Sequence, residues 1–169
     1  SFGDFVNKVV FDVHLPKAIV NTTDLNAFYN GFNGGRNIVL EGVTMKGTLN
    51  NFVIPQGKIS YQNTLIEGDL AFQNLLSEHA NTAVIGKGIH AESIYNDLAY
   101  LMPEVLGKNI PEELQRLGMF SLDGDFAYRT TSLQTNVWLK TNDGEAHIDG
   151  SLDDLTHTDK TAFKGTLTT

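Results

Sequence analysis

Apolar and polar residues alternate along most of this chain with a period of two. In the first such segment Phe11, Val13 and Leu15 share one side, and Asp12 falls on the other. Alternation of this kind is typical of a β-strand with one buried and one solvated face. Because apolar residues occupy odd-numbered positions from Phe5 onward, we expect the chain to be extended from its N-terminus.

A five-residue motif recurs within the strand-like segments. It reads apolar, charged, glycine, polar, apolar, and it occurs as MKGTL, IEGDL, LDGDF, IDGSL and FKGTL, with VIGKGI as a degenerate sixth copy. Since side chains alternate along a strand, the glycine falls on the apolar side in each copy. Glycine inside a strand marks a bend, a bulge or a close backbone approach. We therefore assign a structural role to Gly47, Gly68, Gly124, Gly150 and Gly165.

Three segments depart from the alternation and predict short helices. The first, Thr23–Tyr29, has Thr23 as its candidate N-cap and apolar residues at helical spacing. The second, Asn96–Met102, has the same spacing and is ended by Pro103. A third helical turn is expected at 111–114, where proline takes the first position.

The pattern as a whole predicts a mainly β protein with an antiparallel sheet and two or three short helices. The order helix, glycine strand, return strand, glycine strand occurs twice, which indicates a duplication with approximate internal units 17–82 and 89–155. No linker of the Pro/Ser-rich kind separates the units. Residues 1–169 are therefore expected to form a single repetitive β segment of a longer protein.

The glycines allow two interpretations. If successive strands pair in register, the glycines form a column about which the sheet can fold sharply, leaving an open groove between apolar walls. Alternatively, they let a second sheet or a helix pack closely, and the apolar side becomes an ordinary closed core. The residues alone favour the closed core over the groove.

Composition and charge exclude several classes of protein. The net charge of −8 and the scattered basic residues argue against binding to nucleic acid or to an anionic membrane surface. The absence of cysteine excludes disulfides, zinc–thiolate sites and a cysteine nucleophile. No stretch approaches the roughly 18–20 consecutive apolar residues of a transmembrane helix.

Candidate catalytic groups are few. The carboxylates of Glu67, Asp123 and Asp149 could in principle be paired for glycoside hydrolysis, but each occupies the charged position of the motif and is expected on the solvated side. The five histidines have no metal-ligand spacing, and neither a nucleophile elbow nor a phosphate loop occurs. We therefore predict no catalytic residue, no metal and no cofactor, and a protein that is not an enzyme.

Three features together give the chain a family resemblance. They are the DLxxFY-type segment Asp24–Tyr29 with its echo NDLAYLMPEV at 96–105, the stretch PEELQRLGMFSLDGDF at 111–126, and the recurrent apolar-x-Gly-x-Leu strand. In this order, across residues 17 to 167, they resemble the TamB-like translocation and assembly module family of the AsmA-like superfamily.

The resemblance implies a long protein that is anchored in the inner membrane and crosses the periplasm. Its β structure would curl into an elongated "β-taco" with a hydrophobic groove. The groove would bind or conduct the acyl chains of phospholipid between inner and outer membranes and so support outer-membrane biogenesis. A further implied partner is a BamA/TamA-type outer-membrane barrel, met through a C-terminal part beyond this segment.

Under this interpretation the apolar side of the motif strands lines the groove. The expected lipid-binding residues are Met45, Leu49, Ile66, Leu70, Phe72, Leu122, Phe126, Tyr128, Ile148, Leu152, Phe163 and Leu167. The alternative function is that of a secreted or surface β-sandwich module that binds carbohydrate or protein. It would use Tyr61 and Trp138 as exposed aromatic residues, together with the Asn-rich loop at 30–37.

Overall fold

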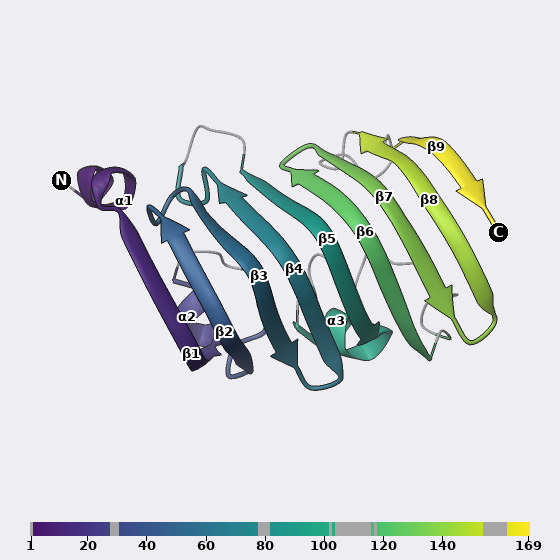
Figure 1. Cartoon of the computed structure of the whole chain (residues 1–169), viewed down its shortest axis with the longest axis horizontal. Coiled ribbons are helices and arrows are strands. Elements are labelled where there is room, and N and C mark those ends of the chain that lie inside the picture. Colours follow the sequence, from purple (N-terminus) through teal and green to yellow (C-terminus); the bar gives the residue numbers. More distant parts are fainter. Residues whose placement is uncertain are drawn as a thin grey trace.

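A computed structural model describes residues 2–27, 31–77, 82–101, 103, 116, 118–153 and 162–169. These residues form one open, curved antiparallel sheet of nine strands, accompanied by three short helices (Figure 1). The strands lie side by side in the order in which they occur in the sequence. The mainly β, curved antiparallel sheet with two or three helices that the sequence predicted is confirmed.

All strands are long enough for a bend to fall in mid-strand. The strands are β1 (Phe11–Asn21), β2 (Asn37–Gly47), β3 (Phe52–Tyr61), β4 (Thr64–Gln73), β5 (Ala83–Ile94), β6 (Met119–Arg129), β7 (Ser132–Thr141), β8 (Gly144–Asp153) and β9 (Ala162–Thr168). The helices are α1 (Phe2–Lys8), α2 (Thr22–Leu25) and α3 (Tyr95–Leu101).

The N-terminal segment is helical, so the predicted start of the first strand at Phe5 is wrong. Within α1 an ion pair of 2.6 Å joins the carboxylate of Asp4 to the ammonium of Lys8, four residues on. Val6 is buried, which anchors one side of the helix. The alternation that predicted a strand is interrupted at position 7, and a helical period fits the remaining apolar residues better. Extended structure begins only at Phe11.

The two helices that follow strands overlap the predicted segments, but each begins one residue earlier, and α2 ends at Leu25 instead of Tyr29. The N-cap of α2 is Asn21, whose side-chain oxygen accepts a 2.9 Å hydrogen bond from the backbone N–H of Thr23. Thr23, the predicted cap, lies inside the helix. Helix α3 begins one residue before Asn96. The predicted turn at 111–114 lies outside the described residues.

Bulges interrupt the ladder in the middle of β3 and β5. Gln56 and Gly88 adopt φ values of +49° and +56°, and the ladder shifts by one residue there. Their backbone N–H groups donate 2.7 Å and 2.8 Å hydrogen bonds to the carboxylates of Asp69 and Asp125 on the next strand. The bond from Gly88, together with Lys87, lowers the pKa of the Asp125 carboxyl.

These hydrogen bonds explain why the residue after the motif glycine is acidic in two copies of the motif. It is Asp69 in IEGDL and Asp125 in LDGDF, and both copies pair with a bulged preceding strand. The other copies carry Thr48, Ser151 or Thr166, and the ladders β1–β2, β7–β8 and β8–β9 that precede them run without a shift. An acidic residue therefore occurs where a bulge leaves a backbone donor to be satisfied.

The motif glycines all fall on one side of the sheet but do not form one column. Gly150 and Gly165 are directly paired, whereas Gly124 lies in the row of Val137 and Ile148, two residues away. Gly68 is paired with Gly57, a glycine outside the motif. Gly47 lies at the end of β2, in the row of Phe52 and Phe72.

The element order β1–α2–β2–β3–β4 recurs as β5–α3–β6–β7–β8. The glycines do not keep equal places in this repeat, because Gly47 ends β2 while Gly124 lies in the middle of β6. The mid-strand position of β2 is taken by Gly42, which has a φ of +60°. The motif glycine therefore occurs at two kinds of position, at a strand end in β2 and at a mid-strand bend in β6.

We expect Gly124→Ala to destabilise the protein by about 2–4 kcal/mol. The φ of Gly124 is +145°, and an added Cβ would overlap the carbonyl oxygen of Asn136 and lie 2.9 Å from Cα of Val137. The measurement is the free energy of unfolding in urea.

Gly144→Ala is the matched control, because Gly144 has a φ of +155° but nothing within 4 Å of the added Cβ. Its expected loss is about 1 kcal/mol. Equal losses for the two variants would contradict the idea that close strand approach at Gly124 shapes the sheet.

Candidate functional site

One side of the sheet, here called the apolar face, carries Val43, Ile54, Leu70, Ile89 and Leu122. The bulges preserve this face. Each bulge adds one residue to its strand. The residues on the apolar face of β3 therefore continue from Ile54 to Gly57, and those of β5 continue from Gly86 to Ile89. Apolar side chains from successive strands therefore stay on the same side although strict alternation is broken.

The middle of the apolar face is buried by its own neighbours. Val43, Ile54, Leu70 and Ile89 come from four successive strands, β2 to β5, and form one cluster, here called the crease. Val43 is 0% exposed and Leu70 is 8% exposed. The described side chains packed on the crease, such as Phe126, also belong to the sheet. A sheet can bury mid-strand side chains in this way when it bends toward them.

Glycines next to the crease are covered by side chains of the same sheet. A Cβ added to Gly57 would lie 2.7 Å from Cγ2 of Ile54, and one added to Gly68 would lie 2.8 Å from Cδ1 of Ile89. The ring of Phe126 lies over Gly86 in the same manner. The space that these glycines provide is thus filled by the bent sheet itself, as when an aromatic ring covers a strand glycine.

The two ends of the apolar face differ. At one end Phe52 stacks on Phe72, with ring centroids 4.7 Å apart, and also meets Phe11 at 6.2 Å. Phe11 and Phe52 lie on strands that are not adjacent, and Gly47 of β2 pairs with both. The missing side chain at Gly47 lets these rings meet. This end is an aromatic rim.

At the other end, the end where Figure 1 shows α2 and α3, the loop after α2 meets α3. The backbone N–H of Asn33 donates a 2.8 Å hydrogen bond to the carbonyl oxygen of Leu101. The guanidinium of Arg36 lies 4.2 Å from the ring centroid of Tyr100 and donates to its hydroxyl. Tyr61 is buried at this end, so its predicted role as an exposed aromatic residue is wrong.

Most of the predicted lining lies beside the crease and is half-buried. Leu70 is the one predicted residue in the crease itself, and Tyr128 is 37% exposed. Leu49 lies in the turn between β2 and β3 and not on a strand. The half-buried members on the apolar face are Met45, Ile66, Phe72, Leu122, Phe126, Ile148 and Leu152.

Two predicted lining residues belong to β9. The backbones of Phe163 and Leu167 pair with those of Leu152 and Ile148. Their side chains lie outside the described part of the structure.

Sequence reasoning missed Ile54, Ile89 and Val137, which lie in strands without a complete motif. Ile54 precedes the bulge in β3, and Ile89 follows the bulge in β5. At both places the two-residue period of the strand fails. A non-glycine residue such as Gln56 at positive φ gives no signal in sequence. Gly88 in VIGKGI is the one hint that the sequence offered, because glycine next to charge inside an apolar run is compatible with a bulge.

The predicted carboxylates lie on the opposite side, the polar face. Asp123 hydrogen-bonds His90 at 2.6 Å, and Glu67 pairs with Lys58 at 3.8 Å. Asp123 and Asp149 lie on β6 and β8, with β7 between them. No group of three or more His, Cys, Asp or Glu side chains in the described residues could hold a metal ion. Glu67 and Asp123 form ion pairs on a solvated surface, and Asp149 is exposed on the same face.

His90, on the polar face, has a raised pKa. The hydrogen bond to Asp123 raises its pKa above the ordinary value of 6.5, partial burial opposes this, and a 3.3 Å contact with Glu92 adds to the rise.

The described part of the chain as a whole is a one-layer sheet. A β-sandwich needs a second sheet packed on the first, and the described residues form one sheet, so that alternative architecture is wrong for them. None of the described helices has the length and apolar character needed to cross a bilayer. Comparison with family models, with curated proteins and with solved structures found no match to this chain.

We expect the charged form of His90 to stabilise the fold. Since its pKa is raised in the folded state, the stabilisation is present below pH 6.5 and is lost as the pH rises through the folded pKa. The side chain is partly solvated, so the loss between about pH 6 and pH 8 should stay below about 1 kcal/mol. Urea unfolding at both pH values measures it.

Asp123→Asn removes the carboxylate and nearly preserves its shape. In this variant the pH dependence should shrink, and an NMR titration should show a lower pKa for His90. An unchanged titration of His90 in Asp123→Asn would refute the assignment of this ion pair.

Proposed function

We propose that the apolar face binds the acyl chains of phospholipid, and that the chain is a periplasmic bridge segment of the TamB-like kind. In this proposal it conducts lipid between inner and outer membranes and takes no part in catalysis. The observation that carries the proposal is a face that is mainly apolar from β1 to β8 while its flanks beside the crease remain half-exposed. Extended exposed apolar surface in a folded protein is typical of a binding site.

The dimensions of the face suit a lipid chain. Eight strand spacings of about 4.8 Å give about 38 Å across the nine strands, in the direction of the crease. One leaflet contributes about half of the ~30 Å hydrocarbon core of a bilayer, so an acyl chain extends about 15 Å. About two chains could therefore follow one another across the apolar face, as conduction requires.

The free energy of binding also favours the passage of lipid over its permanent storage. Burial of an acyl chain contributes about 0.8 kcal/mol per CH₂, so covering about eight CH₂ groups on one side contributes about 6 kcal/mol. Association opposes this with a loss of translational freedom of comparable size. A lipid on a half-open apolar face is thus held weakly and can exchange.

The distribution of charge supports the orientation of the lipid. The motif carboxylates and lysines, such as Glu67, Lys58 and Asp123, lie on the polar face. The apolar face has apolar residues on both sides of the crease, and the flank residue Tyr128 is 37% exposed. The acyl chain would lie on the half-exposed flanks of the apolar face, beside the crease, while its head group stays in water. Attachment to the inner membrane and contact with a BamA/TamA-type barrel are further parts of the proposal.

Leu122→Arg tests the proposal, because Leu122 lies on the apolar face but outside the crease. We expect a loss of stability below about 1.5 kcal/mol, since the side chain is half-buried. We also expect a loss of most bound lipid, because the guanidinium would interrupt the apolar path. The measurement is native mass spectrometry after incubation with phosphatidylethanolamine/phosphatidylglycerol vesicles.

Ser121→Arg is the matched control, since Ser121 is half-buried at the neighbouring position on the polar face. It should bind lipid as the unsubstituted chain does. Leu70→Arg is unsuitable, because Leu70 belongs to the crease and its substitution would unfold the protein whether or not the face is open. If the unsubstituted chain takes up no lipid, or if both Arg variants bind equally, the proposal fails.

A further inference from the structure

The polar face carries a flat aromatic pair that the proposed function does not use. Trp138 of β7 and His147 of β8 are directly opposite one another, with ring centroids 4.6 Å apart and planes inclined by 12°. A 2.7 Å hydrogen bond between Nε2 of His147 and the side-chain oxygen of Asn136 fixes the imidazole. Trp138, the single tryptophan of the chain, is 47% exposed. The pair therefore presents a rigid aromatic surface to solvent.

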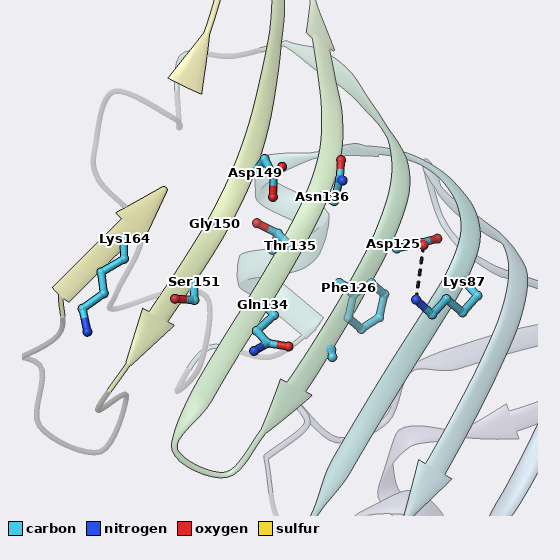
Figure 2. A pocket seen from close by; sticks show the side chains of 11 residues that line it. Lys87, Asp125, Phe126, Gln134, Thr135, Asn136, Asp149, Gly150, Ser151 and Lys164 are labelled. Carbon is cyan, nitrogen blue, oxygen red and sulfur yellow. Dashed lines mark hydrogen bonds and ion pairs between the residues drawn. The ribbon is translucent and has the colours of Figure 1, made fainter. Parts of the chain in front are cut away.

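A shallow depression of about 480 Å³ lies further along β7 and β8, and Figure 2 shows the residues that line it. Asn136, which holds His147, is one of its lining residues. Gln134 and Asn136 line it from β7, and Asp149 and Ser151 line it from β8. Alternate residues on a strand lie about 6.8 Å apart, so Gln134, Asn136 and Trp138 form a straight row. An elongated ligand could follow this row.

Both lysines of the depression are paired with aspartates. Its lining contains two lysines and two aspartates. Lys87 forms an ion pair of 3.3 Å with Asp125, which Figure 2 shows at one side. Lys164 on β9 forms an ion pair of 3.5 Å with Asp153. The depression therefore has no excess positive charge with which to attract a phosphate.

Other hydrogen-bonding groups of the depression remain available. Within the described part of the chain, the side chains of Gln134 and Ser151 have no hydrogen-bond partner, and the carboxylate of Asp149 has none either. Amide, hydroxyl and carboxylate groups together can donate to and accept from a hydroxyl-rich ligand. A tryptophan face favours contact with an apolar, C–H-bearing surface. Both properties occur together in sugar rings.

We propose that Trp138, His147, Asn136, Gln134 and Asp149 form a binding site for an unbranched oligosaccharide of uncharged, β-1,4-linked pyranose rings. One ring stacks on Trp138, and the next hydrogen-bonds the amides and carboxylate along β7 and β8. Such rings are flat and present C–H groups on their faces and hydroxyls at their edges. The site lies on the side of the sheet opposite the crease, so it works independently of lipid.

The single tryptophan supplies the assay. Titration of the purified protein with chitohexaose and with cellohexaose should change the fluorescence of Trp138 in a saturable way for at least one of them, with a Kd below about 10 mM. In isothermal calorimetry, Trp138→Ala should abolish this binding and Trp138→Phe should retain part of it. Asn136→Ala should weaken it by about tenfold, because it removes a hydrogen bond and frees His147.

Val53→Ala is the control, since Val53 is an exposed apolar residue on the polar face of β3, far from the depression. It should bind as the unsubstituted chain does. Circular dichroism should show native structure in all variants, and if Trp138→Ala is not folded, the Asn136→Ala result decides. Absence of saturable binding to both oligosaccharides, binding of sulfated dextran only, or binding that survives Asn136→Ala and Trp138→Phe unchanged would each overturn the proposal.

Discussion

The fold depends on apolar side chains in mid-strand that bury one another across neighbouring strands. Val43, Ile54, Leu70 and Ile89 form this contact in β2 to β5. Within the described residues these side chains are covered by the sheet that carries them. A flat sheet would leave all of them in water, at about 25 cal/mol per Å² of exposed apolar surface. Bending toward one face removes part of that surface from water.

Two local devices produce the bend: one lies in the strand motif, and the other lies on the strands that pair with it. One is glycine at positive φ, as at Gly124, where the neighbouring backbone comes too close for a side chain. The other is a bulge, as at Gln56 and Gly88, which leaves a backbone N–H without a ladder partner. Asp69 and Asp125 satisfy these two donors. The residue after the motif glycine is acidic only in the two copies that face a bulge, so bulge and carboxylate belong together.

Bending gives the two faces of the sheet different properties. On the apolar face the crease is closed by its own side chains, while the flanks around Leu122 and Ile148 stay half-exposed. We propose acyl chains as the ligand of these flanks. On the polar face, carboxylates and lysines pair with one another, and the stacked Trp138 and His147 stand out as exposed aromatic rings among them. We propose a sugar there. One layer of backbone separates the two surfaces, so a substitution on one side can be tested without touching the other.

The sequence by itself determined the strands, their apolar side and the positions of α2 and α3, because alternation and helical spacing are local properties of the chain. It also indicated that the motif glycines share one face. It could not determine that residues 2–8 are helical, since a short apolar segment fits either period. Nor could the sequence determine the position of each bulge, because a positive φ at Gln56 leaves no mark in the sequence.

Tertiary structure alone decided which residues meet across strands. It showed that Gly47 lies at a strand end between Phe11 and Phe52, whereas Gly124 lies in mid-strand. It separated Leu70, which belongs to the crease, from predicted lining residues that remain half-exposed. It also placed Trp138 against His147. These outcomes depend on strand register, and a shift of one residue would reverse the face of every side chain, so no local pattern could fix them.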